Sequence, residues 1–293
     1  MKNTTLLMLH CLLYVAISAQ HDENVDINRS ETMPVILPDP SGKILVNPII
    51  GQKILDENIG NTWYDLQTYG SMQQRFYIYP DGTMGAAWMM GFDIANWSDR
   101  GIGYNYFDGN DWGIYPIESI ASMSTGWASY APLGQSGEIV VGHAMPGDDW
   151  ALLFCKREEK GQGNWQEFFL EGPQEGVGLL WSTIVTNGPD HNTLHVLAAT
   201  YGDPVMQQTG ALLYSRSSDG GSTWDIQNAH LEEIGIDYFT GVGADAYAWA
   251  TPRGNTLAFA VGFVNTHGCI MKSTDNGDSW AFTEVYHCPF YPP

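Results

Sequence analysis

After residue 60 the chain alternates short apolar runs with polar turns that contain glycine or proline. Four β-rich runs, at residues 84–90, 138–143, 193–200 and 257–264, each follow a break in the pattern. A shorter apolar stretch precedes every break, and a polar turn followed by tryptophan comes later in every unit. Apolar runs of this length, bounded by turn residues, are typical of β-strands. We therefore predict four short strands, A to D, in each unit.

Four antiparallel strands in each repeat of about fifty residues indicate the blades of a β-propeller. The predicted fold is all-β, with recognisable blades at roughly 71–115, 116–170, 171–228 and 229–287 in a domain covering residues 59–293. Residues 60–67 resemble residues 221–227, the beginning of a strand D, which suits a ring closed by strands from both ends of the chain.

Two of the polar turns share the spelling Ser-x-Asp-x-Gly-x-x-Trp. Their residues are Ser217, Asp219, Gly221 and Trp224 in one turn and Ser273, Asp275, Gly277 and Trp280 in the other. The pattern predicts a tight hairpin: glycine adopts a positive φ, aspartate accepts bonds from its own turn, and tryptophan begins the return strand. The turns before Trp112 and Trp165 look like degenerate copies.

The repeated turn resembles the Asp-box, or BNR repeat, of sialidase-like β-propellers, and the resemblance covers about residues 60–287. It implies a ring of six or seven blades, so we expect the four recognisable blades to be part of a larger ring. A closed ring of four or five blades is the alternative. The resemblance also implies that the turn residues are structural and that a site lies on the opposite face, formed by B–C loops and D–A connections.

Sialidases, by this resemblance, hold the substrate carboxylate with three arginines, because planar guanidinium groups form bidentate pairs. They add a tyrosine–glutamate nucleophile pair and an aspartate acid/base. Only Arg75 and Arg100 fall on the predicted site face, and Arg75 lacks the surrounding Phe/Tyr-Arg-Ile-Pro spelling. An arginine triad cannot be assembled from these residues, so no catalytic residue is assigned.

Carboxylates and aromatic rings gather in the predicted site-face loops, where they would suit sugar hydroxyls and ring faces. The candidate binding face comprises Arg75, Asp93, Asp99, Arg100, Asp148, Asp149, Tyr201, Asp237, Tyr238 and Asp245. Paired carboxylates could also serve glycoside hydrolysis at the right separation. Acidic solvated loops are the plain alternative for each of these residues.

Residues 1–20 are predicted to be a secretory signal peptide and residues 21–58 a proline-punctuated linker. No other segment could span a bilayer, so we expect a secreted protein, extracellular or in a bacterial cell envelope. The net charge of −21 argues against nucleic acid and anionic membranes as partners.

Cys155, Cys269 and Cys288 remain after the leader, and the last two could pair. There is no Cys-x-x-Cys, and turns such as Asp108-Gly109-Asn110-Asp111 lack the ligand spacing of a calcium loop. We expect no metal and no cofactor. Nothing in the sequence indicates an oligomeric state.

These observations favour a non-catalytic module that binds a glycan or an extracellular protein. The alternative is a sialidase-like exo-glycosidase whose catalytic residues lie partly outside this chain. A third alternative is a surface or adhesion module of a larger secreted protein.

Overall fold

The computed structural model describes residues 35–38, 44–47, 57–64, 67, 74–94, 96–244, 246–263 and 265–290. The chain divides into two units, Met1–Glu57 and Asn58–Pro293. In the first unit, β1 (Val35–Pro38) pairs antiparallel with β2 (Ile44–Asn47), with Val35 opposite Asn47. The expected signal peptide and most of the expected linker lie outside the described residues.

The second unit is built from antiparallel sheets whose strands follow one another in chain order. The first sheet contains β3 (Phe76–Ile78), β4 (Met84–Met90) and β5 (Gly101–Phe107). The second contains β6 (Thr125–Leu133), β7 (Gly137–Ala144), β8 (Ala151–Arg157) and β9 (Gln166–Leu170). The third contains β10 (Val177–Asn187), β11 (Thr193–Gly202), β12 (Leu212–Ser217) and β13 (Ile226–His230). The fourth contains β14 (Tyr247–Trp249), β15 (Leu257–Val261), β16 (Gly268–Ser273) and β17 (Ala281–Tyr286).

This architecture confirms the predicted all-β fold of four-stranded antiparallel blades. In the first sheet the place of a fourth strand is taken by a single antiparallel bridge between Phe107 and Trp112. Gly113 and Pro116 follow at once, and proline cannot donate to a strand ladder. Between β13 and β14 lies a single turn of 3₁₀ helix, Glu232–Ile234. Within the described part of the chain, no helix has the length and apolar character needed to cross a membrane.

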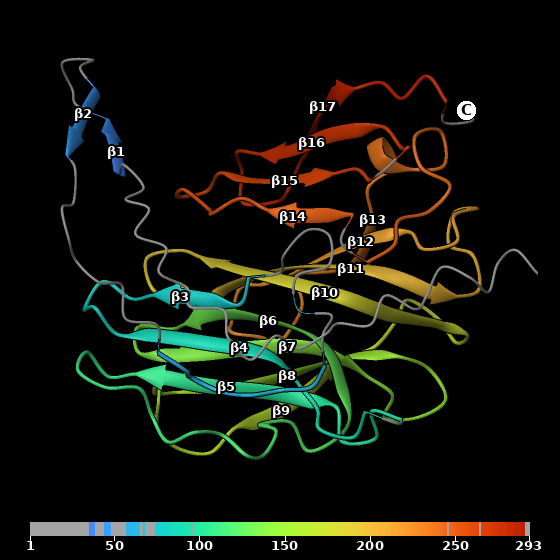
Figure 1. Cartoon of the computed structure of the whole chain (residues 1–293). Coiled ribbons are helices and arrows are strands. Elements are labelled where there is room, and N and C mark those ends of the chain that lie inside the picture. The colour runs from blue at the N-terminus through green and yellow to red at the C-terminus, as the bar shows by residue number, and fades with distance from the viewer. Residues whose placement is uncertain are drawn as a thin grey trace, which may run out of the picture. The chain divides into compact units, whose positions relative to one another are not determined.

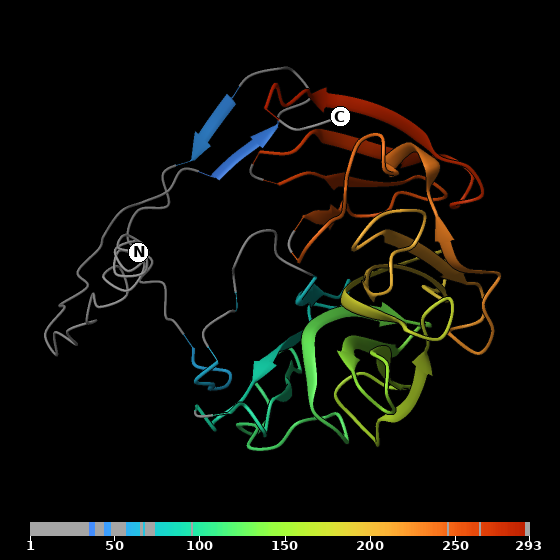
Figure 2. The same cartoon turned by 90° about the vertical axis from the view of Figure 1, so that its right-hand side faces the viewer.

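The four sheets stack in chain order, each against the next (Figures 1 and 2). Hydrogen bonds join the first strands of neighbouring sheets. The Ile184 amide donates to the Ser129 hydroxyl over 3.0 Å, and Trp249 Nε1 donates to the Thr183 carbonyl over 3.3 Å. The first strand of each blade therefore contacts the first strand of the next.

Three apolar clusters fill the spaces between consecutive sheets. Leu153 and Met89 belong to the cluster between the first and second sheets, and Phe154 to the one between the second and third. Trp249 belongs to the cluster between the third and fourth. All eight residues of β7 are buried. Six of them are apolar or glycine, and the two polar ones, Glu138 and His143, form hydrogen bonds inside the fold. Each large apolar side chain so buried stabilises the fold by about 1.5–3 kcal/mol.

The Ser-x-Asp-x-Gly-x-x-Trp turns form the predicted hydrogen bonds. Ser217 Oγ donates to Asp219 Oδ1 over 2.9 Å and accepts from the Gly221 amide over 2.8 Å. The Thr223 amide and hydroxyl both donate to Asp219, and these bonds lower the pKa of its carboxyl to about 2. Gly221 has a φ of 85°. The turn at 273–280 repeats this pattern, with hydrogen bonds from Ser279 lowering the pKa of Asp275 to about 2.

These turns lie beside the turns between strands A and B. The Gly220 amide donates to the Asn192 carbonyl over 3.0 Å, and the Asn276 amide donates to the Asn255 carbonyl over 2.9 Å. We call this end of the sheets the turn face. The B–C loops and D–A connections form the opposite end, which we call the site face.

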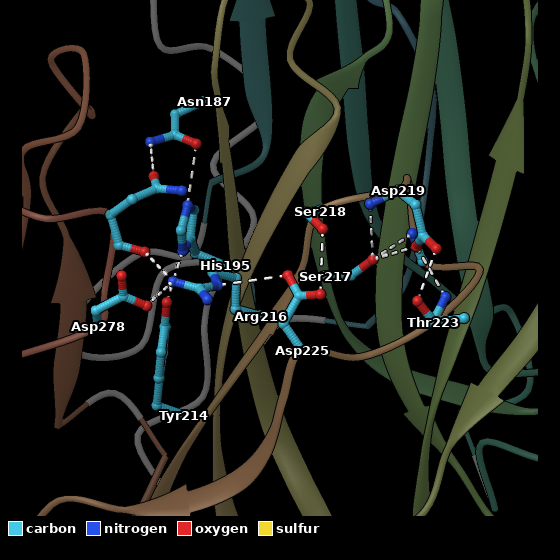
Figure 3. A network of polar contacts seen from close by, with 12 residues as sticks. Asn187, His195, Tyr214, Arg216, Ser217, Ser218, Asp219, Thr223, Asp225 and Asp278 are labelled. Atoms are coloured by element: carbon cyan, nitrogen blue, oxygen red, sulfur yellow. Dashed lines mark hydrogen bonds and ion pairs between the residues drawn. The ribbon is translucent and has the colours of Figure 1, made fainter.

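A buried polar network on the turn face ties the third sheet to the fourth (Figure 3). His195 lies between the Tyr214 hydroxyl at 2.8 Å and Asn187 Oδ1 at 3.1 Å, and burial lowers its pKa to about 3. Arg216 Nη1 donates to Asp278 Oδ1 over 2.6 Å across the two sheets. The network runs from the buried His195 to Asp278, whose side chain is 64 % exposed.

Glu138 anchors a second buried network between the first two sheets. Its side chain is 0 % exposed and accepts from Arg157 Nε over 2.6 Å and from the Tyr104 hydroxyl over 2.8 Å. The Tyr130 hydroxyl also donates to it, and burial raises the pKa of this phenol. The Arg157 guanidinium stacks on the Trp165 ring at 4.2 Å. Cys155, Cys269 and Cys288 are buried free thiols.

Candidate functional site

The site face is organised around a backbone irregularity in β10. The pairing of β10 with β11 shifts register between Leu180 and Thr183, and Trp181 within the shift has a φ of 54°. A positive φ costs a non-glycine residue about 1–3 kcal/mol and persists where the surroundings impose it. Here they do: the Trp181 amide donates to His143 Nδ1 over 3.2 Å, and its carbonyl accepts from the Tyr247 hydroxyl.

The second sheet carries the same irregularity one blade earlier. The pairing of β6 with β7 shifts between Gly126 and Ser129, and Trp127 has a φ of 59°. Its ring stacks on His143 at 6.4 Å, while Trp150 meets the same imidazole edge-on at 5.3 Å. Equivalent tryptophans in neighbouring blades therefore adopt the same conformation on either side of His143.

His143 is neutral in this position. It is 5 % exposed, and burial, assisted by the nearby Arg100 charge, lowers its pKa to about 3. Because Nδ1 accepts the bond from the Trp181 amide, the ring proton resides on Nε2. The imidazole therefore acts as a fixed acceptor that holds the wall of the adjoining pocket.

A pocket of about 620 Å³ opens on the site face between the third sheet and the connection that leads to the fourth. It is lined by Trp181, Thr200, Tyr201, Gly202, Thr209, Gly210, Thr240, Gly241, Val242 and Gly243. The Tyr201 side chain is 56 % exposed. The described lining thus presents two aromatic rings, threonine hydroxyls and backbone groups, and none of these residues carries a charge.

Hydrogen bonds beneath the pocket surface join its two walls. Gln208, which is fully buried, donates through Nε2 to the Phe239 carbonyl over 2.7 Å and to the Ile234 carbonyl over 3.1 Å. Its Oε1 lies 2.7 Å from His230 Nε2. The Val242 amide donates to the Gly210 carbonyl over 2.8 Å. The B–C loop of the third sheet is therefore held against the connection to the fourth, so the pocket is formed before a ligand arrives.

The B–C loop turns tightly at its tip. Val205 and Gln208 exchange two backbone hydrogen bonds of 3.1 and 2.9 Å, and the residues between them, Met206 and Gln207, have φ values of 48° and 69°. Asparagine and glycine are the usual residues of such a turn. The Met206 side chain points to solvent and is 61 % exposed.

Of the sequence-predicted site residues, Tyr201 lies in the pocket. The candidates in the first B–C loop bond mainly to their own surroundings. Asp99 accepts from the Phe92 and Asp93 amides over 2.8 and 3.0 Å. Asp93 accepts from the Ser98 hydroxyl over 2.6 Å.

The two site-face arginines are also engaged. Arg75 Nη1 donates to Gln67 Oε1 over 2.6 Å, and Arg100 Nε donates to the Thr125 carbonyl over 3.1 Å. Neither is among the residues that line the pocket. The structure does not bring the two guanidinium groups together at this site.

The other candidates lie in three places. Asp148 and Asp149 are exposed in the second B–C loop, where Asp149 accepts from the Gly176 amide over 2.9 Å. Asp237 is exposed, whereas Tyr238 packs on Phe282 with ring centroids 4.6 Å apart. Asp245 lies outside the described residues.

The main pocket residues missed from the sequence are Trp181, Thr209 and Thr240. A signal for the first was present, because Trp127 and Trp181 occupy the same place in consecutive repeats. The threonines gave none, since polar loop residues of this kind are common.

No protein-family model matches the chain, and no curated protein matches it in sequence. The fold is similar to that of the Hadza microbial sialidase Hz136, at 13% identity and a TM-score of 0.49, covering 74% of this chain and 47% of that one. Trypanosoma rangeli sialidase in complex with 2,3-difluorosialic acid is 12% identical, with a TM-score of 0.45, covering 86% of this chain and 40% of that one. The six-bladed fungal lectin of Aleuria aurantia is 13% identical, with a TM-score of 0.45, covering 72% of this chain and 58% of that one. The chain covers 40–58% of the length of these three structures.

Proposed function

We propose that this chain is a secreted propeller module that binds a glycan through the pocket beside Trp181, without catalysing a reaction on it. The observation that carries the proposal is the composition of the pocket. Trp181 and Tyr201 supply flat apolar faces, and the threonines and backbone supply uncharged hydrogen-bonding groups. Ligand sites combine such apolar surface with a few placed polar groups.

The same composition argues against catalysis in the pocket. Glycoside hydrolysis uses a pair of carboxyl groups, or a tyrosine nucleophile with its partners. No carboxylate lines the described part of the pocket, and Asp99 and Asp149 are engaged in their own loops. A sialidase-like exo-glycosidase remains the alternative, with its carboxylate-binding arginines supplied from outside this chain.

The fixed geometry of the walls supports binding. Gln208 and His143 hold the two sides of the pocket through buried hydrogen bonds. Because these walls are ordered before binding, less conformational entropy is lost when a ligand binds. A neutral sugar suits this pocket better than an acidic one, because no described lining residue could neutralise a carboxylate.

The test is a glycan-array screen of the whole exported chain beside two variants. Tyr201→Ala removes an exposed ring from the pocket, and Tyr286→Ala removes a similarly exposed ring from β17 outside it. We expect selective binding of neutral glycans, weakened about tenfold or more by Tyr201→Ala and unchanged by Tyr286→Ala.

Absence of binding by folded protein would exclude the glycan proposal. Equal binding by the Tyr201→Ala variant would remove the site from this pocket. Hydrolysis of a fluorogenic sialoside, measured in a separate assay, would favour the glycosidase alternative.

A further inference from the structure

Three potential ligands converge where the fourth sheet meets the site face. His267 immediately precedes β16, Glu284 lies within β17, and His287 follows the end of β17. Gly268 pairs with Tyr286 in the antiparallel ladder, so the start of one strand lies beside the end of the other. This cluster belongs to a different part of the unit from the pocket beside Trp181.

The ligand atoms have spacings suited to a metal ion. Glu284 Oε1 lies 3.4 Å from His267 Nδ1 and 2.9 Å from His287 Nδ1. One ligand atom from each of the three residues lies within 4.8 Å of the others. A tetrahedral zinc ion with ordinary bond lengths separates its ligand atoms by about 3.3 Å. Small side-chain movements therefore suffice to place all three around one ion.

The electrostatics of the cluster also favour a cation. The Cys288 amide donates to His267 Nδ1 over 3.2 Å, so this nitrogen bears a lone pair. The Glu284 carboxylate lies 3.4 Å from the same atom. Two electron-rich atoms at this distance repel each other unless positive charge lies between them. A metal ion between them can supply it, replacing the long Cys288 bond.

Exposure is graded across the three side chains. His267 is 5 % exposed and held in the fold, whereas His287 is 72 % exposed and reaches the solvent. An ion can therefore enter from the His287 side and meet a ligand already fixed behind it. The net charge of −21 draws cations towards the protein as a whole.

We propose that His267, Glu284 and His287 bind one Zn²⁺ ion. Two imidazoles and one carboxylate form a nitrogen-rich set that suits zinc, whereas calcium and magnesium prefer oxygen ligands alone. Three protein ligands leave a fourth position for water or for a donor from a partner. The ion ties the end of β17 to the start of β16. The sequence led us to expect no metal because it has no Cys-x-x-Cys, no calcium-loop spacing and only scattered histidines.

The test is a calorimetric titration of the chelator-treated whole chain with zinc chloride, followed by melting curves with and without zinc. We expect one equivalent to bind at pH 7.5 and the melting temperature to rise.

Two variants locate the site, and two control for charge and histidine content. His287→Ala and Glu284→Gln each remove one ligand and should weaken zinc binding at least tenfold. Glu233→Gln is an exposed change outside the cluster, and His191→Asn replaces a histidine whose φ of 53° asparagine tolerates. Both should bind zinc as the unaltered chain does.

The two ligand variants alter exposed or half-exposed side chains, so we expect both to fold. Zinc binding that survives in both would place the ion elsewhere and overturn the proposal. Folded protein that fails to bind zinc at micromolar concentrations would overturn it as well. Neither result bears on glycan binding, so the two proposals fail or stand separately.

Discussion

The Trp181 amide donates to His143 Nδ1 over 3.2 Å, which links the conformation of a pocket residue to the charge state of a histidine on the neighbouring sheet. The bond requires the lone pair of a neutral imidazole, since a protonated ring offers two donors and no acceptor. Burial supplies that neutrality by lowering the pKa of His143 to about 3. Protonation would break the bond and place an unpaired charge among tryptophans.

We expect the protein to lose stability on mild acidification. His143 and His195 both have a pKa of about 3 when folded, whereas an unfolded histidine has a pKa of about 6.5. Below pH 6.5 the unfolded chain therefore binds protons that the folded chain does not. Each histidine should lower the free energy of unfolding by about 2 kcal/mol between pH 7 and pH 5. Urea titrations at several pH values measure the slope.

The control for this prediction is His143→Gln, which keeps a hydrogen-bond acceptor but cannot titrate. The variant will start from lower stability because its aromatic contacts are lost. Its stability should then fall less steeply with acid than that of the unaltered chain. An equally steep fall would show that His143 is not kept neutral by the fold.

Removing one partner of the buried Glu138–Arg157 ion pair should strongly destabilise the fold. Glu138→Gln leaves the Arg157 guanidinium buried without its counter-charge, and we expect a loss of about 3–5 kcal/mol in the free energy of unfolding. Asp81→Asn removes a partner from the more exposed pair with Lys160 and should cost less than about 1 kcal/mol. Similar losses in the two variants, measured by urea denaturation, would contradict this ranking.

Two glycines with similar positive φ angles should respond differently to substitution by alanine. Gly82 has a φ of 84° and open space around it, so Gly82→Ala should cost only the left-handed strain of about 1–2 kcal/mol. Gly277 has a φ of 87°, and a Cβ there would lie 2.0 Å from the Tyr214 hydroxyl oxygen. We expect Gly277→Ala to cost a further 1–3 kcal/mol or so for the displaced ring. Equal urea denaturation midpoints for the two variants would show that the Tyr214 ring can move aside without a cost in stability.

The adjacent serines of the turn at 217–224 offer a matched pair. Ser217 Oγ accepts from the buried Gly221 amide over 2.8 Å, so Ser217→Ala leaves that donor unpaired and should cost about 1–3 kcal/mol. Ser218 is exposed and bonds to Asp225, and Ser218→Ala should change stability by less than about 0.5 kcal/mol. Thermal and urea unfolding measure the stability of the two variants. Equal stability would show that the Ser217 hydrogen bond is dispensable.

The fold followed from the sequence where local patterns govern the structure. The runs predicted at 84–90 and 138–143 became β4 and β7, since strands buried on their faces are apolar almost throughout. The predicted turn chemistry at Asp219 was confirmed as well, because its bonds form within eight consecutive residues.

Most of the candidate site could not be predicted from local sequence patterns, because it is formed by contacts between segments far apart in the chain. The conformation of Trp181 depends on His143, which lies 38 positions away on another sheet. The pocket combines residues 200–202 and 209–210 with residues 240–243, and the proposed zinc site combines His267 with residues at the end of β17. Tyr201 was predicted as an aromatic residue of the third B–C loop, and the structure places it at the end of β11, immediately before that loop.

The placement of Gln208 makes the third B–C loop a promising scaffold for altered recognition. Its side-chain amide bonds the loop to the Ile234 and Phe239 carbonyls. The side chains of Met206, Gln207 and Tyr201 are exposed, so we expect them to contribute little to folding. A combinatorial library at Tyr201, with positions 206 and 207 restricted to residues that tolerate a positive φ, should retain the parent architecture while sampling new surfaces around the pocket. Selection from such a library would then vary the proposed glycan binding without redesigning the blades.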